Sequence, residues 1–89
     1  MYQYTLLKMD GTKEDLGISK KKELSEMYKI LDCQLVEVIP DAYYEGFGRV
    51  TMWGDEEGRF NENNTRNPFF KVLAPDYDVV GNILMEKKV

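Results

Sequence analysis

The sequence predicts an α+β domain: a small, mostly antiparallel sheet of four to five strands with one main helix and one short helix. Short runs of branched and aromatic residues alternate between polar and apolar positions, as half-buried strands do. One stretch instead places apolar residues at helical spacing. The expected order is strand, helix, strand, strand, an optional short strand, short helix, strand. Its 89 residues allow a single domain, residues 1–89.

The first third of the chain is expected to supply a strand and the main helix. Residues 2–9 alternate well enough for a strand, and an Asp-Gly pair ends it. Residues 12–17 form a connector or a short strand. Ser19 is a good N-cap for a helix that runs to Leu31, because its hydroxyl can accept hydrogen bonds from first-turn amides. The buried stripe of that helix is expected to be Leu24, Met27, Tyr28 and Leu31.

The middle of the chain is expected to supply two further strands. Residues 35–39 are rich in branched side chains, which favour a strand, and Pro40 is expected to stop it. Residues 41–48 are expected to form a connecting loop. The next strand covers residues 49–53.

The chain then turns sharply. Residues 55–58, Asp-Glu-Glu-Gly, fit a type I turn with Asp first and Gly fourth. Residues 59–61 are expected to pair back as a short strand.

The last elements are a short helix and a strand. Asn67 before Pro68 is typical of an N-cap followed by proline at the first helical position. The short helix is expected over residues 69–73, and the final strand over residues 78–86. One face of that strand is expected to carry Val79, Ile83 and Met85.

Negative charge is concentrated in the middle of the chain. From Asp32 to Glu62 there are eight acidic residues and two arginines, a net charge of −6, whereas the whole chain carries −4. A nucleic-acid-binding protein normally shows a basic face instead. The pattern argues against direct nucleic-acid binding and leaves open an acidic face that meets a basic partner.

Other residue types narrow the function further. The chain has no histidine, which removes the commonest general base, and it shows no carboxylate pair, glycine-rich phosphate loop or metal-ligand spacing. We therefore expect a protein that is not an enzyme and has no cofactor or metal. Cys33, the only cysteine, is expected to be a small core residue. Without a secretory signal or a membrane-spanning apolar run, the sequence predicts a cytoplasmic protein with no membrane contact.

Several short motifs resemble a known family. They are the helix over residues 24–31, the runs LVEVIP at 35–40, DEEG at 55–58 and VGNI at 80–83, and Asn67. Together they resemble domain-of-unknown-function family 3846, a group of small proteins from bacteria, phages and mobile elements. The resemblance spans most of the chain, although Asp55 stands where the family usually has Asn. It implies a phage or mobile-element accessory protein in the cytoplasm of a bacterial host and implies no chemistry.

Three lysines form one candidate binding site. Lys20, Lys21 and Lys22 follow the expected N-cap, where free amides and the positive end of the helix dipole suit a phosphate. In the alternative interpretation, which we favour, Glu14, Asp15 and Glu23 compensate these lysines locally.

Aromatic residues form a second candidate site. Tyr43, Tyr44 and Trp53 lie close to glycines and could stack on a base or on the side chains of another protein. Trp53 could equally belong to the core with Phe47, which would leave only the tyrosines exposed.

The acidic turn and one asparagine complete the candidates. Asp55, Glu56 and Glu57 could hold a cation or receive a basic partner, although a solvated turn is the favoured interpretation. Asn67 is expected to cap the short helix, although an amide can also recognise a base edge.

The leading hypothesis is a non-catalytic binding protein that counteracts host defence by stoichiometric binding. In one mechanism the acidic region docks on a basic groove of a host protein. In the other, a pocket between subunits sequesters a small nucleotide ligand with the lysines and tyrosines. An accessory or regulatory interaction domain is the alternative, and a small acid-dependent hydrolase is the less favoured one.

A homodimer is also expected. Residues 35–39 carry apolar side chains on both faces, and one helical layer buries only one face of a sheet. The other face must be covered by the loop at 43–47 or by a second subunit, and a twofold dimer is the commonest such assembly.

Overall fold

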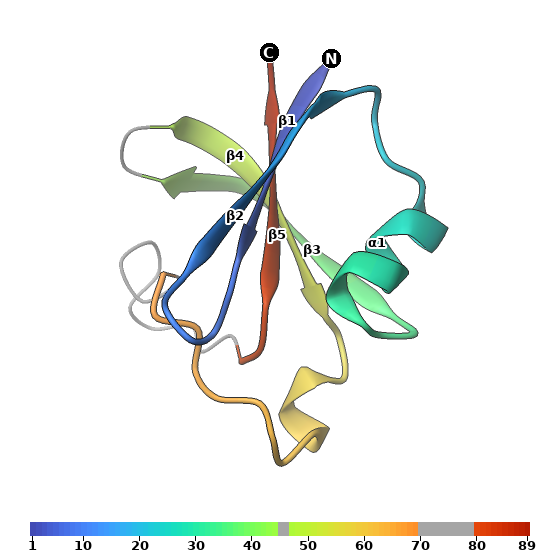
Figure 1. Cartoon of the computed structure of the whole chain (residues 1–89), viewed down its shortest axis with the longest axis vertical. Coiled ribbons are helices and arrows are strands. Elements are labelled where there is room, and N and C mark those ends of the chain that lie inside the picture. The colour runs from blue at the N-terminus through green and yellow to red at the C-terminus, as the bar shows by residue number, and fades with distance from the viewer. Residues whose placement is uncertain (45–46, 70–79) are drawn as a thin grey trace.

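The structure is a computed structural model that describes residues 1–44, 47–69 and 80–89, with the side chains of 40–43 and 59 left out of the description. The described residues form a five-stranded antiparallel sheet with one α-helix against one face (Figure 1). In chain order the strands are β1 (Tyr2–Leu7), β2 (Lys13–Ser19), β3 (Val36–Tyr44), β4 (Gly48–Asp55) and β5 (Ile83–Lys88). The predicted α+β class with a small antiparallel sheet is confirmed.

The sheet order is β2-β1-β5-β4-β3, so the first and last strands of the chain pair at its centre. Leu7 lies opposite Ile83, and Tyr2 lies opposite Lys88. The order of elements differs from the predicted one because β2 precedes the helix. The sequence left residues 12–17 open as a connector or a short strand, and residues 13–17 belong to β2. The predicted short helix at 69–73 falls largely on residues 70–79, which lie outside the described residues.

The helix α1 (Leu24–Leu31) starts later than predicted. Ser19 ends β2, and Glu23 occupies the N-cap without a side-chain hydrogen bond, so the predicted Ser19 cap is wrong. The physical reason is tertiary: the backbone N–H of Lys22 donates to the hydroxyl oxygen of Tyr4 at 2.8 Å, which holds the connector on the sheet.

The helix buries a narrower stripe than expected. Met27 and Leu31 are buried and pack against Tyr4, Leu6 and Leu84 of the two central strands. Tyr28 is half-buried and Leu24 is exposed, so only the inner half of the predicted stripe reaches the core.

The opposite face of the sheet has its own core. Its buried members are Leu7, Val50, Met52, Ile83 and Met85. The aromatic rings of Tyr44, Phe47 and Phe69 pack against them. These residues are buried within a single chain, so an uncovered sheet face is no longer an argument for a dimer. The homodimer stays a prediction.

Proline does not stop the third strand. The prediction ended it at Pro40 and made 41–48 a loop, whereas β3 continues to Tyr44. Two features permit this: β3 is an edge strand, and its register with β4 shifts between Ile39 and Ala42. Edges and bulges are the places in a sheet that tolerate a residue without an N–H.

The acidic turn leads into a 3₁₀ turn, η1 (Gly58–Phe60), so the predicted return strand at 59–61 is wrong. Its amides bond locally: Phe60 N–H donates to the carbonyl of Glu57 at 3.0 Å, and Asn61 N–H to that of Gly58 at 3.3 Å. The Asp55 carboxylate accepts the Glu57 N–H at 2.9 Å, which fixes the turn where the sequence placed it.

The end of α1 provides a prediction about stability. Asp32 follows the helix in the left-handed conformation, with φ 50° and ψ 56°, a conformation that favours glycine. We expect Asp32→Gly to raise the free energy of unfolding by about 0.5–1 kcal/mol. Asp32→Ala removes the same charge but keeps a side chain in the left-handed conformation, so it is expected to lower the free energy of unfolding. Urea denaturation distinguishes them, and a glycine variant less stable than the alanine variant contradicts the prediction.

Candidate functional site

Five carboxylates gather at one end of the fold, which we call the acidic end: Asp32, Asp55, Glu56, Glu57 and Glu62. They come from the end of α1, the end of β4 and the segment around η1. This end lies opposite the chain termini along the longest axis of the molecule, which measures 35 Å (Figure 1). Asp55 is half-buried and the other four residues are exposed.

Two adjoining hollows mark the acidic end. The larger, of about 530 Å³, is lined by residues that include Cys33, Asp55, Glu57 and Phe60. The smaller, of about 250 Å³, shares Asp55 with it and also contacts Asp32. The Phe60 side chain is 84% exposed at this end. The ring of Phe60 is therefore available for contact with another molecule.

Local hydrogen bonds hold the backbone here. The Asn61 side chain accepts the Asn63 N–H at 3.0 Å, and the Asn64 amide donates to the Gly58 carbonyl at 2.9 Å. Within the residues that the structure describes, Glu57 and Glu62 form no ion pair. The turn is therefore internally fixed while these carboxylates face solvent.

Cys33 lies between the acidic end and the helix-side core, against which it packs. Burial raises the pKa of its thiol, and the nearby Asp55 carboxylate raises it further. The thiol is therefore protonated at neutral pH, as suits the small packing residue that the sequence predicts.

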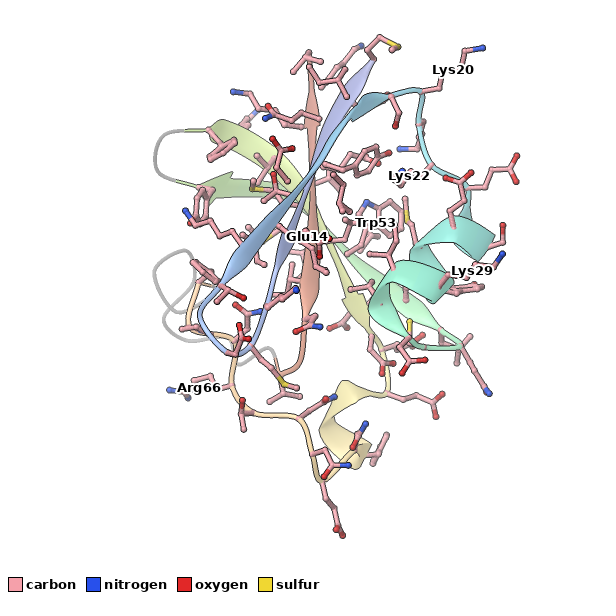
Figure 2. All side chains as sticks on the ribbon, in the orientation of Figure 1. Glu14, Lys20, Lys22, Lys29, Trp53 and Arg66 are labelled. Carbon is pink, nitrogen blue, oxygen red and sulfur yellow. The ribbon has the colours of Figure 1, made fainter. Side chains whose placement is uncertain are left out.

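The three lysines do not sit at a helix N-terminus. They lie in the connector between β2 and α1, and an acidic residue, Glu23, occupies the N-cap. Figure 2 shows Lys20 at the outer bend of this connector, where it is exposed. Lys22 lies 3.9 Å from Glu26, which is not one of the expected partners, and Glu14 instead pairs with Lys8. The lysines are thus compensated in part, but by other carboxylates than Glu14, Asp15 and Glu23.

Lys21 instead joins a buried network that we call the Glu86 network: Tyr4, Lys21, Lys22 and Glu86. The Tyr4 hydroxyl donates to Glu86 Oε2 at 2.6 Å, and Lys21 Nζ lies 3.1 Å from Glu86 Oε1. The Glu86 side chain is only 3% exposed. Burial raises the pKa of Tyr4 well above its usual range, and the hydrogen bond to Glu86 adds to the effect.

The aromatic candidates separate onto two faces of the sheet. Trp53 packs in the helix-side core, between the sheet and α1 (Figure 2), with Lys21 Nζ 5.8 Å from its ring. Tyr44 packs on the other face, 5.5 Å from Phe47 between ring centroids. The two residues therefore cannot form one stacking surface. The side chain of Tyr43 lies outside the described residues.

Asn67 has a structural role. Its side chain is fully buried, and its amide donates to the carbonyls of Leu7 and Gly81, each at 2.9 Å. Its Oδ1 accepts the Phe69 N–H at 3.0 Å, which is the hydrogen bond expected of a capping asparagine. Each polar atom of this side chain is thus already engaged, which leaves none for a ligand.

Sequence reasoning missed Tyr4, Glu86 and Phe60. The sequence held an indication that Glu86 is buried. Glu86 follows the apolar residue Leu84 by two positions on the last strand, and residues two apart on a strand point to the same face of the sheet. Phe60 carried no such signal, since its exposure depends on the 3₁₀ turn.

No protein-family model, curated protein or solved structure matches this chain. The resemblance to family 3846 therefore stays a prediction from short motifs. In the described parts of the chain, no helix is long and apolar enough to cross a membrane. The same residues contain no group of three side chains that could hold a metal ion.

Proposed function

We propose that this protein is a non-catalytic binding protein that occupies a basic partner protein through its acidic end. The observation that carries this proposal is the gathering of five carboxylates at one end of the fold, where the exposed ring of Phe60 shares a hollow with Asp55, Glu57 and Glu62. Carboxylates steer and align a partner of opposite charge, while a desolvated aromatic ring supplies contact energy. The acidic end combines both contributions.

The charge distribution supports an oriented encounter. The end that holds the chain termini carries Lys21, Arg49 and Lys88 beside one hollow, so this group of basic residues lies at the end opposite the acidic end. A molecule with this polarity turns its acidic end toward a positive surface before contact.

A nucleic-acid-binding groove is a positive surface of the right kind, because it is concave and lined with Lys and Arg. We propose a DNA-cleaving defence enzyme of the bacterial host as the partner class, blocked one-to-one in the cytoplasm. The phage or mobile-element origin and the role against defence rest on the resemblance to family 3846. An accessory domain without a defence role would use the same acidic end.

Matched charge variants test this proposal. One variant combines Glu56→Gln, Glu57→Gln and Glu62→Gln, which removes three charges from the acidic end. The control combines Glu14→Gln, Glu23→Gln and Glu26→Gln, three exposed carboxylates of β2, the N-cap and α1. Each is titrated, with the unmodified chain, into DNA cleavage by a panel of purified bacterial restriction and defence nucleases.

We expect the acidic-end variant to need at least about tenfold more protein for half inhibition, a loss of about 1.4 kcal/mol. The control should change by less than about twofold, because surface charges away from an interface contribute little to affinity. Phe60→Ser should weaken inhibition without changing the charge. Equal losses in both charge variants, or a panel that the unmodified chain does not inhibit, contradict the proposal.

A further inference from the structure

A third hollow, of about 260 Å³, lies at the other end of the molecule, and we call it the terminal pocket. It opens on the helix side of the sheet, near the chain termini. Residues of three neighbouring strands and of the connector line it: Tyr2, Lys21, Arg49, Thr51, Glu86 and Lys88. The strand register explains their meeting, because Thr51 lies opposite Glu86 and Tyr2 lies opposite Lys88.

The pocket exists because the helix is short. The eight residues of α1 span about 12 Å, whereas a six-residue strand spans about 20 Å. Met27 and Leu31 cover the part of the sheet around Leu6 and Leu84. Among the described residues, the segment that reaches over the central strands beyond the N-terminal end of α1 is the connector with Lys21.

The lining is cationic in a chain whose net charge is negative. Three cationic side chains, those of Lys21, Arg49 and Lys88, share the pocket with one carboxylate. That carboxylate, Glu86, is 3% exposed and accepts a hydrogen bond from Tyr4, so it faces the protein more than the pocket. Lys21 and Lys88 alone outnumber this carboxylate, so an anion at the mouth of the pocket meets a net positive charge.

One of these cations is held in place before any ligand arrives. Lys21 Nζ lies 3.1 Å from Glu86, 5.2 Å from the ring centre of Tyr2 and 5.8 Å from that of Trp53. The Lys21 side chain nevertheless remains 55% exposed, so its ammonium also faces solvent. An ammonium that is fixed but accessible loses little entropy when it binds an anion.

We propose that the terminal pocket binds a nucleoside monophosphate. Its phosphate would pair with Lys21 and Lys88, and its base would stack on the ring of Tyr2. The volume lies just below the range of about 300–1,000 Å³ typical of ligand sites, which suits a ligand of about the size of one nucleotide. This site is independent of the acidic end and lies within one subunit.

Titration with AMP, followed by NMR of the ¹⁵N-labelled chain, tests the assignment. Adenosine and inorganic phosphate are titrated separately to divide the contribution of the base from that of the phosphate. Lys88→Gln and Tyr2→Leu alter the pocket without breaking the ion pair between Lys21 and Glu86. Lys29→Gln is the matched control, because Lys29 is exposed on the last turn of α1 (Figure 2). Thermal unfolding of each variant establishes that it is folded.

We expect AMP to shift the amides of Tyr2, Thr51 and Lys88. Lys88→Gln should raise its Kd at least about fivefold and Tyr2→Leu at least about threefold, while Lys29→Gln leaves it within about twofold. Adenosine and phosphate should each bind more weakly than AMP. The proposal is overturned if AMP shifts none of these amides, if Lys29→Gln has the effect of Lys88→Gln, or if phosphate binds as tightly as AMP.

Discussion

Replacing Tyr4 with phenylalanine is expected to lower the free energy of unfolding by about 2–3 kcal/mol at neutral pH. The substitution removes the 2.6 Å hydrogen bond to the buried carboxylate of Glu86, and it also leaves the Lys22 N–H without its acceptor. Tyr28→Phe is the matched control, since Tyr28 is half-buried on α1. This variant should lose less than about 0.5 kcal/mol of unfolding free energy. Urea denaturation followed by circular dichroism measures both.

The same residue predicts a response to alkaline pH. Burial and the hydrogen bond to Glu86 raise the pKa of Tyr4 in the folded state, whereas the pKa of a tyrosine in the unfolded chain is about 10. The folded state therefore keeps a proton that the unfolded state releases, and the resulting stabilisation is complete below about pH 10 and is lost as pH rises further. The unmodified chain should lose stability above pH 10 more steeply than Tyr4→Phe. Parallel curves contradict this interpretation.

Asn67→Ala is expected to lower the free energy of unfolding by about 3 kcal/mol. Its buried amide serves the carbonyls of Leu7 and Gly81, and each buried polar group left without a partner costs about 1–3 kcal/mol. The Phe69 N–H loses its acceptor as well. Asn63→Ala is the control, because the Asn63 side chain is exposed. This variant should lose less than about 0.5 kcal/mol of unfolding free energy.

Urea denaturation of both asparagine variants gives the comparison. A third variant, Asn67→Asp, retains the acceptor oxygen but directs a carboxylate at two carbonyl oxygens, so it should be at least as unstable as Asn67→Ala. An Asn67→Ala variant that loses less than about 1 kcal/mol shows that this side chain does not hold the two segments together.

Local patterns predicted the elements whose hydrogen bonds are local or whose burial alternates. Residues 2–9 are predicted as a strand because their side chains alternate, and residues 49–53 are predicted as the strand after the next connection. The structure has β1 and β4 at these places. The Ser19 cap failed because the next residues are held by Tyr4 and Glu86, which are 82 positions apart in the chain. The Pro40 stop failed because the edge position of β3 depends on the order of the whole sheet.

The candidate sites were predictable to a similar extent. The acidic turn at 55–58 was visible in the sequence, and the Asp55 hydrogen bond fixes it. The sequence did not predict that Asp32 lies near this turn, because their proximity requires the end of α1 to lie beside the end of β4. The grouping of Tyr44 with Trp53 failed for a related reason: β3 and β4 direct these residues to opposite faces of the sheet.

Amide mapping of the complex tests the proposed function most directly. The ¹⁵N-labelled chain is titrated with the nuclease that it inhibits, and with a short Lys/Arg-rich peptide as a minimal basic probe. We expect the largest shifts of amide signals at residues 32–35 and 55–63. These shifts should disappear in the variant with Glu56, Glu57 and Glu62 changed to Gln. Changes centred instead on Tyr2, Lys21 and residues 86–88 would contradict docking through the acidic end.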